Sequence, residues 1–270
     1  MSFASSFRVE PGKRVDLSKH DPRDTAGLSD KEDTRAAIAA DAAAIDALQT
    51  RLYAEGRQAL LVVLQGMDCA GKDGTARSVF NSCGPIGVTV TSFKGPSVED
   101  LAHDFLWRIH EKCPPRGYIG LFNRSHYEDV LVVKVKKLAP SDEIEQRYEQ
   151  INHFEKQLAE NGTRVLKFML HISKDEQKKR LEERVADETK RWKFNPGDLE
   201  DRLLWNDYTK AYEEALSRCS TEHAPWHVIP ADRNWVRNAI IGRIVRETLQ
   251  EMDPQLPKPK GWDPATIQIV

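Results

Sequence analysis

Five short apolar runs recur along the chain, separated by segments in which apolar residues have a helical spacing. The runs cover residues 59–65, 88–93, 118–122, 164–172 and 226–230. Nearly continuous hydrophobicity in short runs is typical of strands buried on both faces, and strands divided by helices are typical of a parallel sheet. The pattern therefore predicts an α/β fold whose parallel sheet is covered by helices on both faces. Such sheets bind ligands at the carboxyl ends of their strands.

Polar residues mark where the intervening helices begin and end. Ser29 and Glu32 have the spacing of a capping box, in which each side chain satisfies a backbone N–H at a helix start. Gly56 is predicted to end that helix. Further helix starts are predicted by Ser97 with Asp100, by Ser173 with Glu176, and by Pro140-Ser141 before a long amphipathic stretch.

The two ends of the chain differ from its centre. Residues 1–28 combine proline, glycine and charged residues without periodicity, which predicts an N-terminal arm. Residues 253–270 begin with a proline-rich stretch and are predicted to form an extended C-terminal tail. The remaining residues, 29–252, have the length of a single large α/β domain in this chain of 270 residues.

The composition of the chain limits which kinds of ligand and partner it can bind. The formal net charge is -2 with 30% charged residues, so any site for a polyanion must be a local basic patch. No apolar stretch approaches the roughly 18 residues of a membrane span, and the N-terminus has no apolar signal region. The four cysteines have neither metal-ligand spacing nor a disulfide framework. We therefore expect a cytoplasmic protein with no membrane or nucleic-acid partner.

The first apolar run leads into a glycine-spaced phosphate loop. Gly66, Gly71 and Lys72 match the pattern G-x-x-x-x-G-K, in which backbone N–H groups surround phosphate oxygens and the lysine reaches a phosphate. The next residue is usually a hydroxyl that holds Mg²⁺, but here it is Asp73. Phosphate contacts are predicted for the following residues: Gly66, Ala70, Gly71, Lys72, Asp73 and Gly74.

Two residues of this loop have more than one interpretation. Asp73 predicts either a rearranged metal site, since a carboxylate repels phosphate unless a cation lies between them, or a plain carboxylate at a helix N-terminus. Asp68 is a candidate Mg²⁺ ligand. Cys69 lies near the same helix start, where a thiol pKa can be lowered, although it can equally fill a variable loop position.

The third apolar run ends beside a second group of polar residues. Asn123 stands where nucleotide-transferring enzymes with such loops often carry an acidic metal ligand. It is a candidate metal and nucleotide-site residue, because its amide can still coordinate an ion or orient a metal-bound water, although it supplies no charge. Arg124 is a candidate for direct contact with phosphate, because its planar guanidinium binds oxygens in pairs. Glu128 lies just downstream. His126 is expected to pack or to form hydrogen bonds and not to catalyse, since phosphoryl transfer requires little acid-base chemistry from the protein.

Residues 177–201 form a basic segment with aromatic residues and a Pro-Gly loop. Its cations include Arg180, Arg184, Lys190 and Lys193, which surround Trp192. A run of charges is often only a solvated helix face. Here the run leads from a capped helix into a loop with aromatics, which favours a lid that closes over phosphates and excludes water.

Taken together, these segments resemble the polyphosphate kinase 2 family. The resemblance covers about residues 7–257 and depends on four segments in order: the phosphate loop 66–74, the segment 122–128, residues 184–193, and Pro230-Ala231-Asp232-Arg233 with Trp235. It implies a fold like that of thymidylate kinase, with a five-stranded parallel sheet and a helical lid. It also implies phosphoryl transfer between inorganic polyphosphate and nucleotides with Mg²⁺, or Mn²⁺ in its place.

The resemblance also assigns individual residues. Asp68 and Lys72 match the family's metal-binding aspartate and phosphate-binding lysine, and Arg124 matches the arginine after the third strand. Arg184 and Lys193 lie in the matching lid, where Arg184 is expected to act in catalysis and Lys193 to bind phosphate. Arg180, in the same basic segment, is also expected to bind phosphate. Asn123 departs from a frequent aspartate, which leaves the second metal ligand open.

Further expectations concern substrates and assembly. Glu128 resembles a glutamate of the subgroup that acts on both AMP and ADP, so reversible formation of ADP and ATP is expected. The family is often dimeric or tetrameric, so a homodimer or homotetramer is expected. A polyphosphate chain needs a basic track, for which Arg77, Lys94, Arg108 and His110 are candidates, although each can also be an ordinary surface residue.

Two other functions are compatible with the sequence. An ATP-dependent kinase of a nucleotide or a small metabolite can share this fold, but the missing hydroxyl after Lys72 counts against it. A nucleotide-sensing module that binds phosphate without transferring it is a more distant alternative, and such a module does not require an intact lid.

Overall fold

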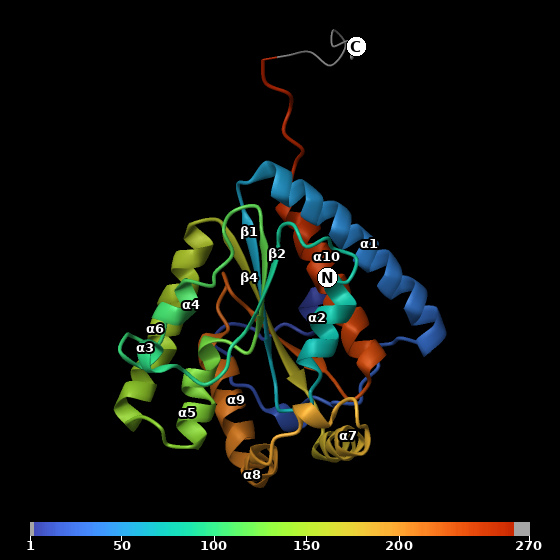
Figure 1. Ribbon diagram of the computed structural model, residues 1–270. Helices are drawn as coiled ribbons and strands as arrows, with labels where there is room; N and C mark the ends of the chain where they lie inside the picture. The colour runs from blue at the N-terminus through green and yellow to red at the C-terminus, as the bar shows by residue number, and fades with distance from the viewer. Residues whose placement is uncertain (1–2, 262–270) are drawn as a thin grey trace.

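A computed structural model describes residues 3–261 and confirms the α/β fold (Figure 1). Five parallel strands form one sheet in the order β2-β3-β1-β4-β5. The strands are β1 (Ala59–Gln65), β2 (Val88–Ser92), β3 (Ile119–Asn123), β4 (Thr163–His171) and β5 (Trp226–Pro230). Since β1 is central, the segment that follows it leaves the middle of the sheet at the carboxyl edge.

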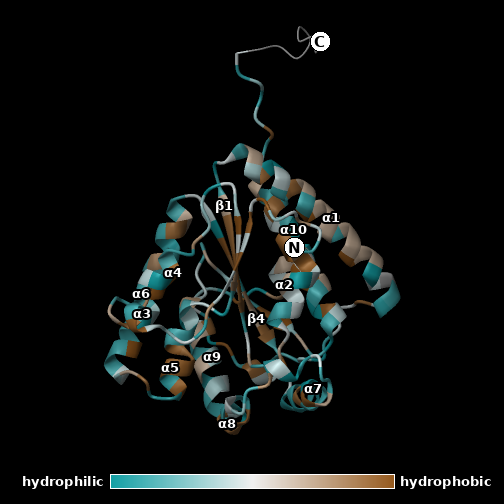
Figure 2. Cartoon of the chain, viewed as in Figure 1, coloured by the Kyte–Doolittle hydropathy of each residue, from teal (hydrophilic) through white to brown (hydrophobic). Residues whose placement is uncertain are grey.

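Helices cover both faces of the sheet, as the strand pattern predicts. Figure 1 has α1 (Lys31–Glu55), α2 (Lys72–Phe80) and α10 (Asn234–Met252) on one face. The other face carries α4 (Trp107–His110), α6 (Ser141–Glu160) and α9 (Trp205–Cys219). Each face has its own cluster of buried apolar side chains. In Figure 2 the most hydrophobic colours accordingly follow β1 and β4 between the two layers.

Short elements surround the carboxyl edge of the sheet. They are α3 (Val98–Leu101), α5 (Val132–Val135), α7 (Lys174–Ala186) and α8 (Gly197–Leu203), with 3₁₀ turns at Phe3–Ser6, Leu17–Lys19, His126–Val130 and Arg191–Lys193. In Figure 1, α7 and α8 lie at the lower end of the molecule, where β4 ends. The predicted lid segment 177–201 therefore lies next to the edge at which ligands are expected.

Most predicted boundaries agree with the structure to within one residue. Ser97 and Asp100 form a complete capping box, and Ser173 accepts a hydrogen bond from the Glu176 N–H at the start of α7. The first helix begins at Lys31, after the expected Ser29 position, where the Asp30 carboxylate accepts the Glu32 N–H at 2.7 Å. A small residue shift of this kind arises because neighbouring polar residues compete for the same helix end.

The edge strand β2 does not have the predicted burial on both faces. Val90 is 60% exposed, and the other residues of the strand are exposed or half-buried. An edge strand has a single neighbouring strand, and its Thr and Ser side chains tolerate contact with water. The apolar pattern of residues 88–93 therefore predicted a strand correctly but overstated its burial.

The N-terminal arm packs against the domain. Val9, Val15 and Leu17 are buried, and the Val9 N–H donates to the Trp226 carbonyl oxygen at 2.8 Å beside β5. Residues 253–261 leave the domain at the end opposite α7 (Figure 1). The rest of the predicted arm and tail, residues 1–2 and 262–270, lies outside the described residues. No helix within residues 3–261 combines the length and the hydrophobicity needed to cross a membrane.

Candidate active site at the carboxyl edge of the sheet

The phosphate loop connects β1 directly to the N-terminus of α2. Gly66 and Gly71 have φ angles of 152° and 101°, in the region that favours glycine. Gly71 is the residue that caps α2, and Lys72 is the first residue of the helix. The N–H groups and the dipole at a helix N-terminus favour an anion, so this loop has the geometry of a phosphate site.

Lys72 is buried beneath the loop that it follows. Its Nζ donates to the carbonyl oxygens of Gly66 at 2.7 Å and Met67 at 3.2 Å. Burial lowers the pKa of this ammonium group, and the positive charge of Arg124 lowers it further. Among the described residues, no carboxylate lies within ion-pair distance of Lys72, so its charge is available to an anion in the loop.

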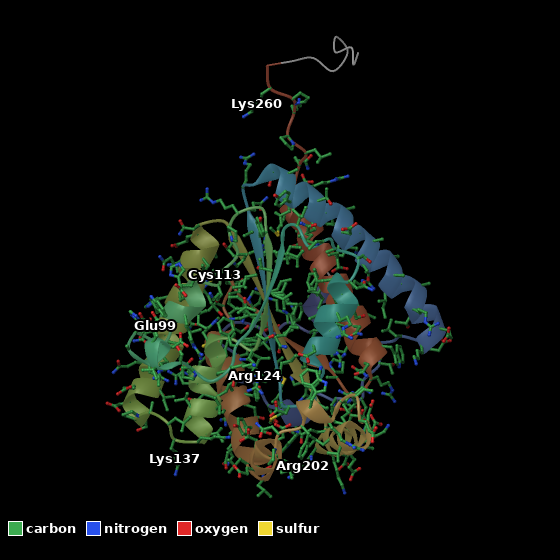
Figure 3. All side chains as sticks on the ribbon, viewed as in Figure 1. Glu99, Cys113, Arg124, Lys137, Arg202 and Lys260 are labelled. Atoms are coloured by element: carbon green, nitrogen blue, oxygen red, sulfur yellow. The ribbon has the colours of Figure 1, made fainter. Side chains whose placement is uncertain are left out.

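Arg124 connects the ends of β1 and β3. Its guanidinium donates to Asp68 Oδ1 at 2.7 Å and lies 3.4 Å from Glu128 Oε2 (Figure 3 shows its place at the carboxyl edge). Burial opposes the charge, but the two carboxylates outweigh it and raise the pKa of Arg124. The backbone of Arg124 has a φ of 63°, which is rare for a residue with a side chain. The surrounding contacts thus hold Arg124 in an unusual conformation that points it at the phosphate loop.

Asp73 connects α2, β3 and the predicted lid. Its carboxylate accepts a hydrogen bond from Asn123 Nδ2 at 2.6 Å and one from Lys193 Nζ at 3.0 Å. Burial raises the pKa of Asp73, but the hydrogen bonds from Lys193 and Asn123 outweigh it and lower the pKa overall. The carboxylate also lies in the first turn of α2, where the helix dipole favours negative charge.

The other predicted lid cations hold the lid together and join it to the loop. Arg184 Nη1 lies 3.3 Å from both the Lys193 carbonyl oxygen and Asp198 Oδ2. Arg180 pairs with Glu176 and donates to the carbonyl oxygens of Cys69, Ala231 and Asp232. In this arrangement the guanidinium of Arg180 is fully engaged by the protein, and its direct contact with phosphate stays a prediction.

A cavity of about 920 Å³ brings most of the predicted residues together. Its lining includes Asp68, Gly71, Lys72, Asp73, Gly74, Lys94, Asn123, Arg124, Arg180, Arg184 and Lys193. Trp192, Lys179 and Lys190 of the predicted lid also line it. The cavity is therefore walled by cations from four separate segments, as a site for a long polyanion requires.

Several predicted residues lie elsewhere. Gly66 and Glu128 line a small neighbouring hollow with Trp205, Tyr208 and Tyr212, and Ala70 is completely buried. Arg77 lines a third hollow beside Phe80 and Val88. Arg108 lines a separate cavity, while the His110 ring packs on Phe154. Of the four candidates for a basic track, Lys94 lines the main cavity. Arg77, Arg108 and His110 are not among the residues that line it.

The site includes residues that the sequence did not single out. Arg237, on α10, lines the cavity although its side chain is only 2% exposed. Gln177 donates to the Asp68 carbonyl oxygen at 3.2 Å. One feature of the sequence could have identified Arg237. It is a charged residue that lies among apolar residues in the segment 234–252, two positions after Trp235.

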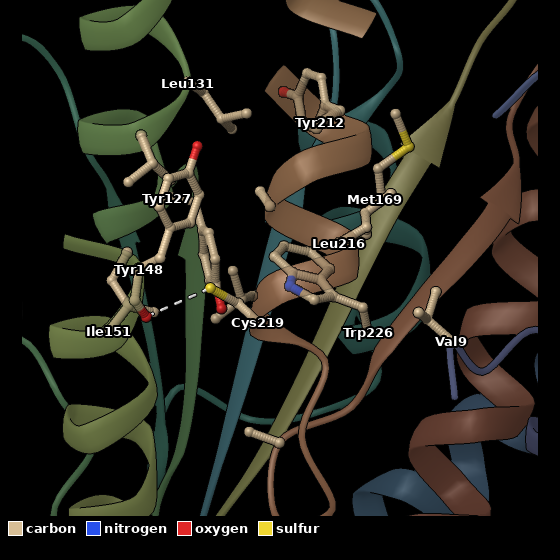
Figure 4. Close-up of a cluster of buried hydrophobic side chains, with 14 of the residues drawn as sticks. Val9, Tyr127, Leu131, Tyr148, Ile151, Met169, Tyr212, Leu216, Cys219 and Trp226 are labelled. Carbon is tan, nitrogen blue, oxygen red and sulfur yellow. Dashed lines mark hydrogen bonds between the residues drawn. The ribbon is translucent and has the colours of Figure 1, made fainter. Parts of the chain in front are cut away.

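Buried polar groups support the segment that carries Arg124. His126 and Glu155 are completely buried, with 3.1 Å between His126 Nε2 and Glu155 Oε1, and the Tyr127 hydroxyl donates to the same oxygen at 2.9 Å. The Lys167 ammonium pairs with the other oxygen of Glu155 and donates to the Cys219 carbonyl oxygen at 2.7 Å. Figure 4 shows Tyr127 beside Cys219 and Trp226 in this core. The prediction that His126 packs or forms hydrogen bonds is confirmed, since its ring contacts Phe154 and lies at hydrogen-bond distance from Glu155.

The thiol of Cys69 does not have the environment of a reactive cysteine. Burial raises its pKa, and this effect outweighs the lowering by Arg184. The interpretation of Cys69 as a thiol activated by a helix N-terminus is therefore wrong. Loss of hydration destabilises the thiolate more than the nearby positive charge stabilises it.

Carboxylates and an amide suited to Mg²⁺ face the cavity. Within residues 3–261 no group of three or more His, Cys, Asp or Glu side chains has the geometry of a metal site. Mg²⁺ commonly uses only one or two carboxylates and takes its other ligands from phosphate and water. Asp68, Asp73 and Asn123 all line the cavity that contains Lys72, so these residues fit an ion that shares ligands with a phosphate substrate.

Comparisons with known proteins agree with this geometry. The family model described as polyphosphate kinase 2 matches residues 28–257. The AMP/ADP-polyphosphate phosphotransferase of Meiothermus ruber is 51% identical over 255 residues, covering 94% of this chain and 96% of that protein. The ADP-polyphosphate phosphotransferase of Rhodopseudomonas palustris is 41% identical over 264 residues, covering 93% and 91%. A crystal structure of polyphosphate kinase 2 from Arthrobacter aurescens TC1 superposes with a TM-score of 0.94 at 43% identity, covering 98% and 94%.

Proposed function

The chain belongs to the polyphosphate kinase 2 family, and we propose that it transfers phosphoryl groups between inorganic polyphosphate and nucleotides. The observation that carries this proposal is the cavity around the phosphate loop. Its walls contain cations that come from the loop, from the end of β3, from the predicted lid and from α10. Such a site suits two polyanions at once. A triphosphate alone would not need so extended a basic wall.

The reaction requires two anions to approach in line. A terminal phosphate oxygen of the nucleotide attacks the end phosphorus of polyphosphate, and the bridging P–O bond breaks, so that the shortened chain leaves with the electron pair. Because this oxygen is already ionised at neutral pH, the protein's main tasks are to position the reactants and to neutralise charge. Lys72 and Arg124 line the cavity beside the loop, with Arg124 held by Asp68 and Glu128, and Lys193 adds a cation from the lid.

We propose Mg²⁺, or Mn²⁺ in its place, as the cofactor. Asp68 would hold the ion, with Asn123 as a neutral ligand or as a partner of a bound water. When bound, the ion would neutralise phosphate charge. Asp68 is ion-paired with Arg124 in the described structure, so this pair would hold the carboxylate in place at the cavity wall. Activity should disappear on chelation with EDTA and return with added Mg²⁺.

AMP and ADP are both proposed as acceptors. The similarity of Glu128 to the glutamate of the subgroup that uses both nucleotides supports this, as does the name of the Meiothermus ruber relative. Glu128 pairs with Arg124 and lines the hollow formed with Trp205, Tyr208 and Tyr212, beside the main cavity. A carboxylate between the hollow and the main cavity can distinguish AMP from ADP, because the two nucleotides differ in the number of phosphates that lie near it.

The acceptor proposal is tested by measuring rates with AMP and with ADP under saturating polyphosphate. Glu128→Gln should change the ratio of the two rates by about tenfold, since a charge-assisted contact of this kind is worth roughly 1.5–3 kcal/mol. The exposed Glu99, on α3, provides the matched control Glu99→Gln. An unchanged ratio in Glu128→Gln would remove Glu128 from this role.

A homodimer or homotetramer in the cytoplasm is also proposed. The exposed β2 edge, with Val90 60% exposed and Ile86 65% exposed beside it, supports a contact between copies, because exposed strand edges are commonly covered. All four cysteines are free thiols, which supports a reducing compartment. Light scattering at several concentrations tests the assembly, and a monomer throughout would contradict it.

A further inference from the structure

The backbone carbonyl groups of residues 66–70, the first part of the phosphate loop, all accept hydrogen bonds from side chains. The carbonyl oxygens of Gly66 and Met67 accept from Lys72, and that of Asp68 accepts from Gln177. Those of Cys69 and Ala70 accept from arginines. A loop binds phosphate only if its N–H groups face the anion and its carbonyl dipoles point away, so these donors stabilise the binding orientation of five successive peptide groups.

Arg237 is the donor to the Ala70 carbonyl group, and it carries a full charge. Its Nη1 donates to the Ala70 carbonyl oxygen at 2.9 Å and to Asn234 Oδ1 at 2.8 Å, while Nε and Nη2 contact Asn238 Oδ1. The residue belongs to α10, is 2% exposed, and lines the same cavity as Arg124.

The charge of Arg237 has no counterion in the protein. Among residues 3–261, no carboxylate lies within ion-pair distance of this guanidinium. Burial lowers the pKa of Arg237 to about 9, with a smaller contribution from Arg180, so the group is still charged at neutral pH. A buried charge without a partner is costly in a protein interior. An anion in the adjoining cavity, which Arg237 also lines, would offset that cost.

Contact geometry couples Arg237 closely to the loop. A Cβ placed on Gly71 would lie 2.0 Å from Arg237 Nη1 and 2.6 Å from Cζ. The guanidinium therefore packs directly against the last loop residue before Lys72. Because packed interiors have little free space, a replacement of this guanidinium would change the packing around Gly71.

We propose that Arg237 is a positioning residue for polyphosphate: it fixes the Ala70 carbonyl group away from the anion and adds an uncompensated positive charge beside the loop. The proposal rests on the proposed function, in which the anion is an inorganic phosphate chain. Arg237 acts through the loop backbone and through the electrostatic effect of its charge, and it is assigned no part in the bonds that form and break.

The experiment compares Arg237→Gln and Arg237→Lys with the control Arg243→Gln. Arg243 lies on the same helix but is exposed and paired with Glu247. Calorimetry measures the Kd of tripolyphosphate, and steady-state kinetics with ADP separate the KM for polyphosphate from kcat. Thermal unfolding with and without tripolyphosphate reports the stability of each variant.

Arg237→Gln should raise the Kd of tripolyphosphate and the KM for polyphosphate by roughly ten- to a hundredfold, as expected for a lost charge-assisted hydrogen bond. Arg237→Lys keeps the charge but loses the forked contact, so its increase should be smaller. If Arg237→Gln does not fold, Arg237→Lys decides alone, and parent-like Kd and KM in that variant would overturn the proposal.

Two outcomes separate this proposal from the proposed function. A parent protein that binds tripolyphosphate but transfers nothing to ADP contradicts the function and leaves the role of Arg237 in binding intact. A merely structural role for Arg237 predicts a lower thermal stability of Arg237→Gln with an unchanged Kd, and that result would overturn the inference.

Discussion

Asp73 illustrates how one residue changes the chemistry expected of a phosphate loop. In place of a hydroxyl it presents a carboxylate, which accepts hydrogen bonds from Asn123 and Lys193. This carboxylate forms its ion pair with Lys193 of the lid, and its effect on the more distant Lys72 is the weakest of those that raise the pKa of that lysine. The same contacts join the start of α2 to β3 and to the lid. Asp73 therefore holds these segments together and also changes the charge of the site.

Gly71→Ala tests the contact between the loop and Arg237. The new Cβ would meet Arg237 Nη1, and the φ of 101° at this position is unfavourable for alanine. We expect a loss of about 1–3 kcal/mol in the free energy of unfolding and a fall in turnover of at least about tenfold. Gly84→Ala is the matched control, because a Cβ added at Gly84 would have no atom within 4 Å. Equal behaviour of the two variants would contradict the close fit.

His227 predicts how stability depends on pH. Burial lowers the pKa of His227 to about 4, whereas an ordinary histidine titrates near 6.5. The unfolded chain therefore binds a proton at a pH where the native protein does not, so this contribution is complete above pH 6.5 and is lost as the pH falls toward 4. Between pH 7 and pH 5 the loss should be about 2 kcal/mol.

Urea unfolding at pH 7 and pH 5 measures that loss. His227→Phe removes the titrating group, so the variant should lose less stability over this interval than the parent does. His126 and His171 also have lowered pKa values and contribute to the pH dependence of both proteins. Parallel loss in parent and variant would show that His227 does not contribute.

At the scale of elements, the sequence predicted most of the fold because its signals are local. Apolar runs identified all five strands, and capping residues located the starts of α3 and α7. The burial of β2 was overstated, since its place at the edge depends on strand order, which no local pattern encodes. The phosphate loop was predictable because its glycines, lysine and helix start are contiguous.

The supports of the site were not predictable in this way. Glu155 on α6 and Lys167 on β4 are polar residues within otherwise ordinary amphipathic and apolar patterns. Their pairing beneath Tyr127 depends on the packing of three elements. The same holds for Arg237, whose partner is the carbonyl group of Ala70, 167 positions earlier in the chain.

Lys167→Met tests the support formed by α6, β4 and the segment after Arg124. The substitution leaves the completely buried Glu155 carboxylate without its cation. We expect a loss of about 3–5 kcal/mol in the free energy of unfolding, measured by urea denaturation. The double variant Lys167→Met with Glu155→Gln should recover part of it.

Lys156→Met is the control for this prediction. Lys156 lies on α6 in an exposed pair with Glu160, so its replacement should change the stability by less than about 1 kcal/mol. A Lys167→Met protein that is as stable as this control would contradict the proposed support.

At the scale of the whole molecule, the cavity combines segments that are remote in sequence. The loop after β1, the end of β3, the lid after β4 and the helix after β5 each contribute cations to one site. A parallel sheet produces this convergence, because all its strands end at the same edge. The overall net charge of -2 gives no sign of it, since the positive charge is concentrated locally.

The most direct test of the central claim is the formation of ATP from ADP with polyphosphate as the sole phosphoryl donor and Mg²⁺ present. The parent protein should form ATP, and Lys72→Ala should do so at least about a hundredfold more slowly while it is still folded, as expected when a charge-stabilising group is removed. No ATP from polyphosphate, with phosphorylation of AMP by ATP instead, would contradict the account and identify an ATP-dependent kinase.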